Sequence, residues 1–123
     1  MKRQTLLATS LSLALAGAAC GPFHLGSRDQ ATVIFSNETL NQATVYALEL
    51  SQPVRIGTVL ALHTDTLRVP SSVIRANGGQ TSIVARILTQ SYQPSSGPIT
   101  LRTDDVIRVR LSSDGRSLFV TPQ

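Results

Sequence analysis

The stretch that decides the fold is Val106–Leu111, with the sequence VIRVRL. Its second, fourth and sixth residues are Ile107, Val109 and Leu111, and an arginine stands between each of them and the next. Successive side chains of a β-strand point to opposite faces, so this alternation predicts a strand with one face in a hydrophobic core and the other in solvent.

Similar short runs, rich in β-branched residues, continue from Ala31 to the end of the chain, and turn residues separate them. None of them shows a sustained helical period. The runs predict strands at 32–36, 43–50, 55–62, 66–69, 82–90, 99–102, 106–111 and 118–121. Short strands at such regular spacing predict an all-β domain, an antiparallel β-sandwich of about seven or eight strands.

Two local features modify this pattern. Ile56, Leu60 and Leu62 fall on alternate positions of their run, so all three are predicted to face the core. Gly57 inside the same run predicts a β-bulge or a close approach of another backbone. The segment 71–77, with the sequence SSVIRAN, is long enough only for a single helical turn.

The N-terminal segment 1–19 has the features of an export signal. Lys2 and Arg3 form a short positive region, and an uncharged, mainly apolar run follows at 6–16. This run is shorter than the roughly 20 apolar residues that span a bilayer as a helix. The sequence therefore predicts a signal peptide at 1–19, a tether at 20–30 that is rich in glycine and polar residues, and the β-sandwich domain at 31–123.

Cys20 is the only cysteine in the chain, and two interpretations of it remain open. The small residues before it fit cleavage by an ordinary signal peptidase after Ala18 or Ala19, which would leave a soluble periplasmic or secreted domain. Alternatively, Ala18-Ala19-Cys20 resembles the lipobox of bacterial lipoproteins, although Gly17 stands where that family usually carries leucine or another aliphatic residue. Acylation would explain a single thiol in an oxidising compartment.

The lipobox resemblance implies a specific anchor and location. It implies a diacylglyceryl thioether on Cys20 and an N-linked acyl chain such as palmitate. Several acyl chains hold a protein on a membrane stably, whereas one binds only marginally. Gly21 stands where many lipoproteins of the inner membrane carry aspartate, which favours the outer membrane, facing the periplasm.

Charge and composition argue against nucleic acid as a partner. Beyond residue 19 the chain has nine Arg against five Asp and two Glu, a net charge of +2, and the arginines are spread singly. The whole chain contains no Trp, and only three Phe and two Tyr. Nucleic-acid binding usually needs a clustered basic patch, often with aromatic residues that stack on bases.

The domain resembles small bacterial lipoproteins with an immunoglobulin-like or transthyretin-like β-sandwich, a group whose biochemical role is largely unassigned. The resemblance rests on Asn37 and on the segments 44–46, 55–59, 67–70 and 105–111. That group often has glycine before the aspartate that opens the last of these segments, where this chain has Asp104. The resemblance implies the sandwich fold and no active site.

Two polar groups are candidates for catalysis or metal binding. His63 and Asp65 could form a base and its orienting carboxylate, or half of a metal site, but zinc needs three or four ligands and the only other histidine is His24 in the tether. Asp104 and Asp105 could form a carboxylate pair, but calcium normally takes six to eight oxygens. Turns explain both groups better. We therefore predict no catalytic residues, no metal and no cofactor.

The loop 91–98 is the most distinctive, because Tyr92, Pro94 and Pro98 could contact a partner. The competing interpretation is a crossover between sheets with a packed tyrosine. Asn37-Glu38-Thr39 matches a glycosylation sequon, which we attribute to chance. Together, these features predict a non-enzymatic, lipid-anchored module of the cell envelope with a structural or accessory binding role. The alternative is an envelope protein that binds a small ligand, a glycan or a peptide.

Overall fold

The computed structural model of the protein describes residues 30–122, which form nine strands and one short helix. The helix, α2, lies between β4 and β5 in the chain. In chain order the elements are β1 (Gln30–Asn37), β2 (Ala43–Glu49), β3 (Gln52–Val59), β4 (Thr64–Pro70), α2 (Ser71–Ala76), β5 (Gln80–Thr81), β6 (Ile83–Ile87), β7 (Ile99–Thr100), β8 (Val106–Leu111) and β9 (Leu118–Pro122).

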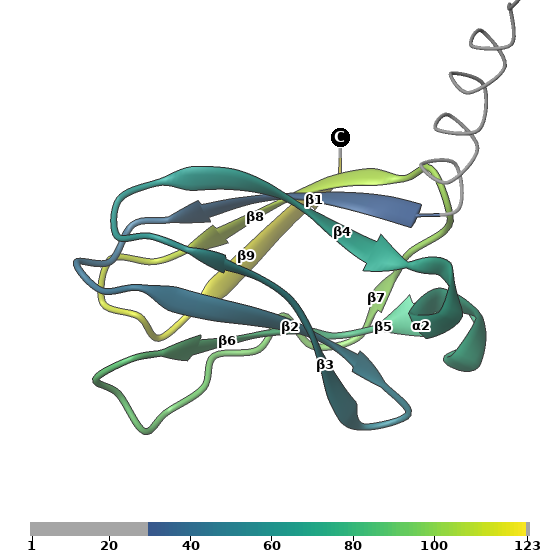
Figure 1. The fold of residues 1–123 in the computed structure, drawn as a ribbon, viewed down its shortest axis with the longest axis horizontal. Coiled ribbons are helices and arrows are strands. Elements are labelled where there is room, and N and C mark those ends of the chain that lie inside the picture. The colour runs from purple at the N-terminus through teal and green to yellow at the C-terminus, as the bar shows by residue number, and fades with distance from the viewer. Residues whose placement is uncertain (1–29, 123) are drawn as a thin grey trace, which may run out of the picture.

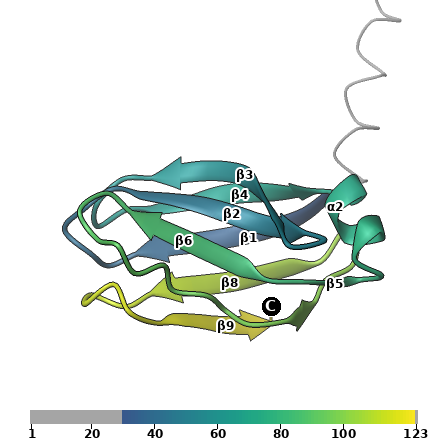
Figure 2. The same cartoon turned by 90° about the horizontal axis from the view of Figure 1, so that it is seen from below.

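The strands form a sandwich-like, all-β fold (Figure 1). One sheet has the order β4-β1-β8-β9, the second has the order β3-β2-β6, and β5 and β7 form a small third sheet beside α2 (Figure 2). Every strand pair is antiparallel except β1 with β8, which run parallel. The predicted all-β sandwich is confirmed, with this parallel pair as its one departure from an antiparallel arrangement among the described strands.

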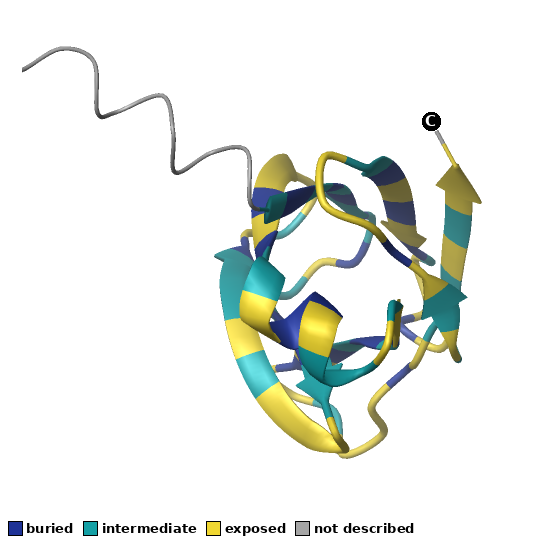
Figure 3. Ribbon diagram, turned by 90° about the vertical axis from the view of Figure 1, so that its right-hand side faces the viewer, coloured by how far each residue is buried: buried dark blue, intermediate teal, exposed yellow. Residues whose placement is uncertain are grey.

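Alternation of buried and exposed residues along the strands builds the core, as the end-on view shows (Figure 3). β8 has the predicted bounds, with Ile107, Val109 and Leu111 buried and both arginines exposed. β1 alternates in the same way and contributes Val33 and Phe35, neither of which is accessible to solvent. Apolar residues of both larger sheets meet in one continuous cluster, and burial of their surface is the main force that holds the two layers together.

The prediction that Leu60 and Leu62 face the core together with Ile56 is wrong, because β3 contains a bulge. Val45 of β2 pairs with Gly57, but the next residue of β2 pairs with Arg55, so Ile56 is the extra residue. The extra residue reverses the inward and outward positions that follow it. Val59 is therefore buried, whereas Leu60 and Leu62 are 56% and 64% exposed in the turn after the strand.

A side chain at position 57, beside this bulge, would also collide with a neighbouring strand. A Cβ atom at position 57 would lie 2.5 Å from Cδ2 of Leu67, a buried residue of β4. The absence of a side chain at Gly57 thus makes room for the Leu67 side chain of β4. The predicted bulge is confirmed beside Gly57, whereas the group that approaches Gly57 closely is a side chain and not another backbone.

Gly57→Ala should lower the free energy of unfolding by about 1–3 kcal/mol, because the new methyl group overpacks the space that Leu67 fills. Urea titration followed by circular dichroism measures this change. Leu67→Ala also destabilises the domain, but it opens space beside position 57, so the double variant should be more stable than the sum of the two single effects predicts. Strict additivity would show that the two side chains do not compete for the same volume.

Other boundaries differ from the predictions for local reasons. β3 begins at Gln52 and includes Pro53, which was predicted to lie in a turn. Proline is tolerated there because β3 is an edge strand, with β2 as its neighbour on one side only. The predicted helical turn is confirmed as α2, which buries Val73 and Ile74, while the short strand β5 was not predicted.

Candidate functional site

The proposed lipidation site lies outside the part of the chain that the structure describes. This applies to Cys20, to the predicted signal peptide at 1–19, and to the tether except for Gln30, which is the first residue of β1. Within residues 30–122, no helix has the length and apolar character needed to cross a bilayer.

His63 and Asp65 are each bonded to neighbouring main-chain groups. Nδ1 of His63 lies 2.8 Å from the carbonyl oxygen of Ala61, in the turn between β3 and β4. Oδ1 of Asp65 accepts a hydrogen bond from the main-chain N–H of Thr66 at 2.9 Å. His63 lies in the predicted turn, but Asp65 belongs to β4, which begins at Thr64. Both side chains are exposed, so the surroundings supply no water-excluded site for acid–base chemistry.

Asp104 and Asp105 form the turn that opens β8. Oδ2 of Asp105 accepts a hydrogen bond from the main-chain N–H of Arg102 at 2.9 Å, and the Asp105 N–H donates to the Arg102 carbonyl at 3.1 Å. Asp104 has a φ of 71°, in the left-handed region where glycine is favoured and aspartate is tolerated. Its main-chain N–H donates to the carbonyl of Gln30 and so fixes the start of β1.

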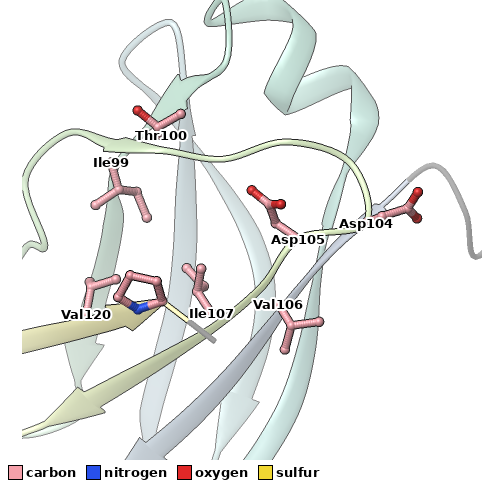
Figure 4. A pocket seen from close by; sticks show the side chains of 8 residues that line it. Ile99, Thr100, Asp104, Asp105, Val106, Ile107 and Val120 are labelled. Atoms are coloured by element: carbon pink, nitrogen blue, oxygen red, sulfur yellow. The ribbon is translucent and has the colours of Figure 1, made fainter.

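These two aspartates border a cavity of about 680 Å³ at the end of the domain where β1 and β8 begin (Figure 4). Apolar side chains from β7, β8 and β9 line most of it, including Ile99, Ile107 and Val120. On the polar side of the cavity, the Asp105 carboxylate bonds to the main chain of its own turn. The cavity lies beside neither His63 nor Tyr92.

Within the described residues, no group of three or more histidines, cysteines, aspartates or glutamates is placed to hold a metal ion. We expect a chelator such as EDTA to leave the melting temperature of the protein unchanged, because turn hydrogen bonds already account for the carboxylates of Asp65 and Asp105. Differential scanning calorimetry with and without EDTA checks this expectation. A fall in melting temperature that added zinc or calcium reverses would contradict it.

The loop 91–98 is a crossover, and its tyrosine is not packed. The loop leads from β6 in the three-stranded sheet through β7 to β8 in the four-stranded sheet. Tyr92 is 57% exposed, so the interpretation as a packed tyrosine is wrong. Pro94 is buried, and its carbonyl accepts a hydrogen bond from the Ala85 N–H of β6 at 3.1 Å, whereas Pro98 is exposed. Tyr92 and Pro98 remain accessible to a partner.

Asn37 organises a buried polar network that the sequence did not reveal. The side chain is 1% exposed. Its Nδ2 donates to the carbonyl oxygens of Asn41 at 2.8 Å, Val59 at 3.1 Å and Leu60 at 3.2 Å. Its Oδ1 accepts from both the main-chain N–H and the hydroxyl of Thr39, at 2.9 and 2.8 Å. The residues of the sequon therefore tie the β1–β2 loop to the end of β3.

Three loops meet at this end of the domain, which lies opposite the point where β1 begins (Figure 1). The N–H of Leu62 donates to the carbonyl of Thr39, and the N–H of Leu88 donates to the carbonyl of Gln42. These bonds join the β1–β2 loop to the β3–β4 turn and to the loop after β6. Four strongly exposed leucines, which we call the leucine tip, stand on these loops: Leu40 (80%), Leu60 (56%), Leu62 (64%) and Leu88 (74%).

Two pairs of opposite charges lie near the leucine tip. Nη1 of Arg110 lies 3.1 Å from Oε1 of Glu38, and its guanidinium stacks at 4.5 Å from the ring centre of Phe119. In the β8–β9 turn, hydrogen bonds from the Ser112 hydroxyl and the Arg116 N–H lower the pKa of Asp114. Asp114 and Arg116 carry opposite charges, so the turn adds no net charge to this end.

Comparison with known proteins gives no family for the chain. No family model matches it, and no curated protein matches it. Among solved structures, an NMR structure of a protein from Eubacterium rectale is similar with a TM-score of 0.49 and 10% sequence identity, over 79% of this chain and 93% of that one. What is shown for this chain is a small all-β, sandwich-like domain.

Proposed function

We propose that the protein is a lipid-anchored module of the bacterial cell envelope, with a structural or accessory binding role and no catalysis. In this proposal Cys20 carries the acyl chains, the segment 20–30 connects the lipid to the domain, and an immunoglobulin-like or transthyretin-like sandwich presents loops to a partner. The observation that carries it is the position of a single cysteine directly after Ala18-Ala19, ten residues before the domain begins at Gln30.

The described residues support a binding role over an enzymatic one. The side chains that could do chemistry, such as His63 and Asp105, bond to main-chain groups of their own turns. The leucine tip, in contrast, gathers four exposed apolar side chains on loops at one end of a rigid scaffold, which is where binding surfaces commonly lie. Tyr92 lies in the loop after β6. Nε2 of Gln90 donates to the carbonyl of Tyr92 and to that of Gly115, and so links this loop to the β8–β9 turn.

Metabolic labelling with an alkyne-bearing palmitate analogue tests the anchor. The full chain expressed in an exporting bacterium should incorporate the label and enter the detergent phase on Triton X-114 partition. Cys20→Ser should do neither, because the thiol that carries the thioether is gone. Ser27→Ala in the same segment is the matched control and should be labelled like the unchanged protein. An unlabelled, water-phase protein with Cys20 intact would contradict the anchor.

A further inference from the structure

We propose that the leucine tip inserts into the surface of a lipid bilayer, so that the domain makes a second membrane contact besides its lipid anchor. This inference rests on the proposed membrane-anchored function and names the partner of the loop end. The four side chains of the leucine tip are 56–80% exposed, although each stands in a turn where a polar residue would suit water better.

The loops hold these leucines in fixed positions. Leu40 lies between Thr39 and Asn41, both of which bond to the buried side chain of Asn37. The carbonyl of Leu60 accepts a hydrogen bond from the same Asn37 side chain. A rigid presentation lowers the entropy lost on binding, because the apolar side chains need no reorganisation of the backbone.

Leu62 also has an unfavourable backbone conformation. Its φ is 59°, a left-handed conformation that disfavours a branched side chain such as leucine and favours glycine or asparagine. Leu62 is thus unfavourable both in its backbone conformation and in its exposure to water. Leu50 in the β2–β3 turn has a similar φ of 50° and is also exposed, so the grouping of the four leucines, and not this strain, distinguishes the tip.

A lipid surface fits the leucine tip better than another protein does. The apolar surface of the tip consists of four leucines, whereas a stable protein interface uses about 20–30 residues of all types on each side, so a second copy of the chain would need much additional surface outside the tip. The leucines come from separate loops as projecting side chains, and acyl chains can accommodate projecting groups at any spacing. Since Glu38 pairs with Arg110, and Asp114 and Arg116 carry opposite charges in one turn, we expect insertion to depend mainly on apolar burial and little on salt.

The chain between Cys20 and the domain is long enough for the leucine tip to reach the membrane that holds the anchor. Ten residues span at most about 35 Å when fully extended. β1, which runs from the anchored end to the tip end, has eight residues and is about 26 Å long. The extended segment can therefore pass along the length of β1 with about 9 Å to spare for the loops beyond it, so that both contacts can lie in one bilayer.

A single environment-sensitive fluorophore at the tip tests the proposal. The full chain carrying Cys20→Ser and Leu88→Cys is labelled with NBD and mixed with neutral phosphatidylcholine vesicles. The control carries the label at Leu50→Cys, a leucine of similar exposure (67%) in the β2–β3 turn at the opposite end. We expect a blue shift, and quenching by nitroxides on the acyl chains, at position 88 only, with little change in high salt.

A second variant shows whether the other leucines contribute. Leu40→Gln with Leu62→Asn, added to the labelled Leu88→Cys chain, should lower the ratio of inserted to uninserted probe by about tenfold or more for each leucine removed. Its melting temperature should not fall, since both positions are exposed and asparagine suits the φ of Leu62.

Several outcomes would overturn the lipid assignment. These are a water-like probe at position 88 in the presence of vesicles, equal burial of the probes at 88 and 50, and a concentration-dependent shift at 88 without lipid, which would indicate a second copy. The Cys20→Ser change makes this test independent of acylation. A failed palmitate labelling therefore counts against the anchor, and a failed probe experiment counts against insertion of the leucine tip.

Discussion

Val109→Asp should prevent the domain from folding or lower its free energy of unfolding by several kcal/mol. Val109 is 1% exposed in β8, and it packs in the apolar cluster between the two larger sheets. A carboxylate there would have no hydrogen-bonding partner and no water, and this loss of solvation is among the largest costs that one substitution can cause. Urea denaturation, or the loss of a cooperative thermal transition, measures the effect.

Arg108→Asp is the matched control on the neighbouring residue. Arg108 lies on the exposed face of β8, so the same new carboxylate would remain in water. We expect a change of about 1 kcal/mol or less. If Arg108→Asp proved to be the more damaging variant, the register of β8 would be shifted by one residue, because such a slip exchanges the two faces of a strand.

Asn37→Asp should lower the free energy of unfolding by about 3–5 kcal/mol at neutral pH. The change keeps the size of the side chain but replaces the Nδ2 donor by an oxygen that faces the carbonyl oxygens of Asn41, Val59 and Leu60. Three acceptors lose their donor, and a charge is placed in a site that is 1% exposed. Thermal and urea denaturation measure the loss.

The pH dependence of the stability loss and a control variant show whether the loss comes from the Asn37 side chain or from any change in the β1–β2 loop. Burial among carbonyls should raise the pKa of the new carboxyl above its unfolded value, so its destabilisation is complete above the folded pKa and is relieved as the pH falls below it. Asn41→Ala is the control, because the Asn41 groups in the network are its main-chain oxygen and nitrogen. It should change the stability by less than about 1 kcal/mol. Equal losses for the two variants would contradict a specific role for the Asn37 side chain.

The sequence predicted the strands well because their side-chain period is a local property. β8 has the predicted bounds, and every other predicted strand overlaps an observed one. The pattern failed where a non-local contact decides the conformation. At Gly57 the sequence suggested a bulge, but the positions that then face outward depend on Ile56 being the unpaired residue. Leu60 and Leu62 were therefore predicted to be buried and are exposed.

The candidate site was less predictable than the fold. Asn37, Thr39 and Leu60 come together only because β1 and the β3–β4 turn end at the same place, and no spacing in the sequence encodes that meeting. The sequence did not predict the leucine tip, because residue type alone does not show whether a leucine is buried or exposed. A leucine in a turn, such as Leu40 among polar neighbours, was the one available signal. The distinctive loop did contain an exposed aromatic residue, Tyr92.

The parallel pairing of β1 with β8 also has a kinetic consequence. Thr32 pairs with Val106 and Asn37 with Leu111, so the central strand of the larger sheet is completed by a strand near the end of the chain. Closing so long a loop delays folding, and all-β sandwiches, in which non-local pairings dominate, fold in roughly milliseconds to seconds. A ribosome-bound chain that lacks β8 leaves one edge of β1 unpaired. The larger sheet can therefore be completed only after residue 111 has left the ribosome, when nearly the whole chain has been synthesised.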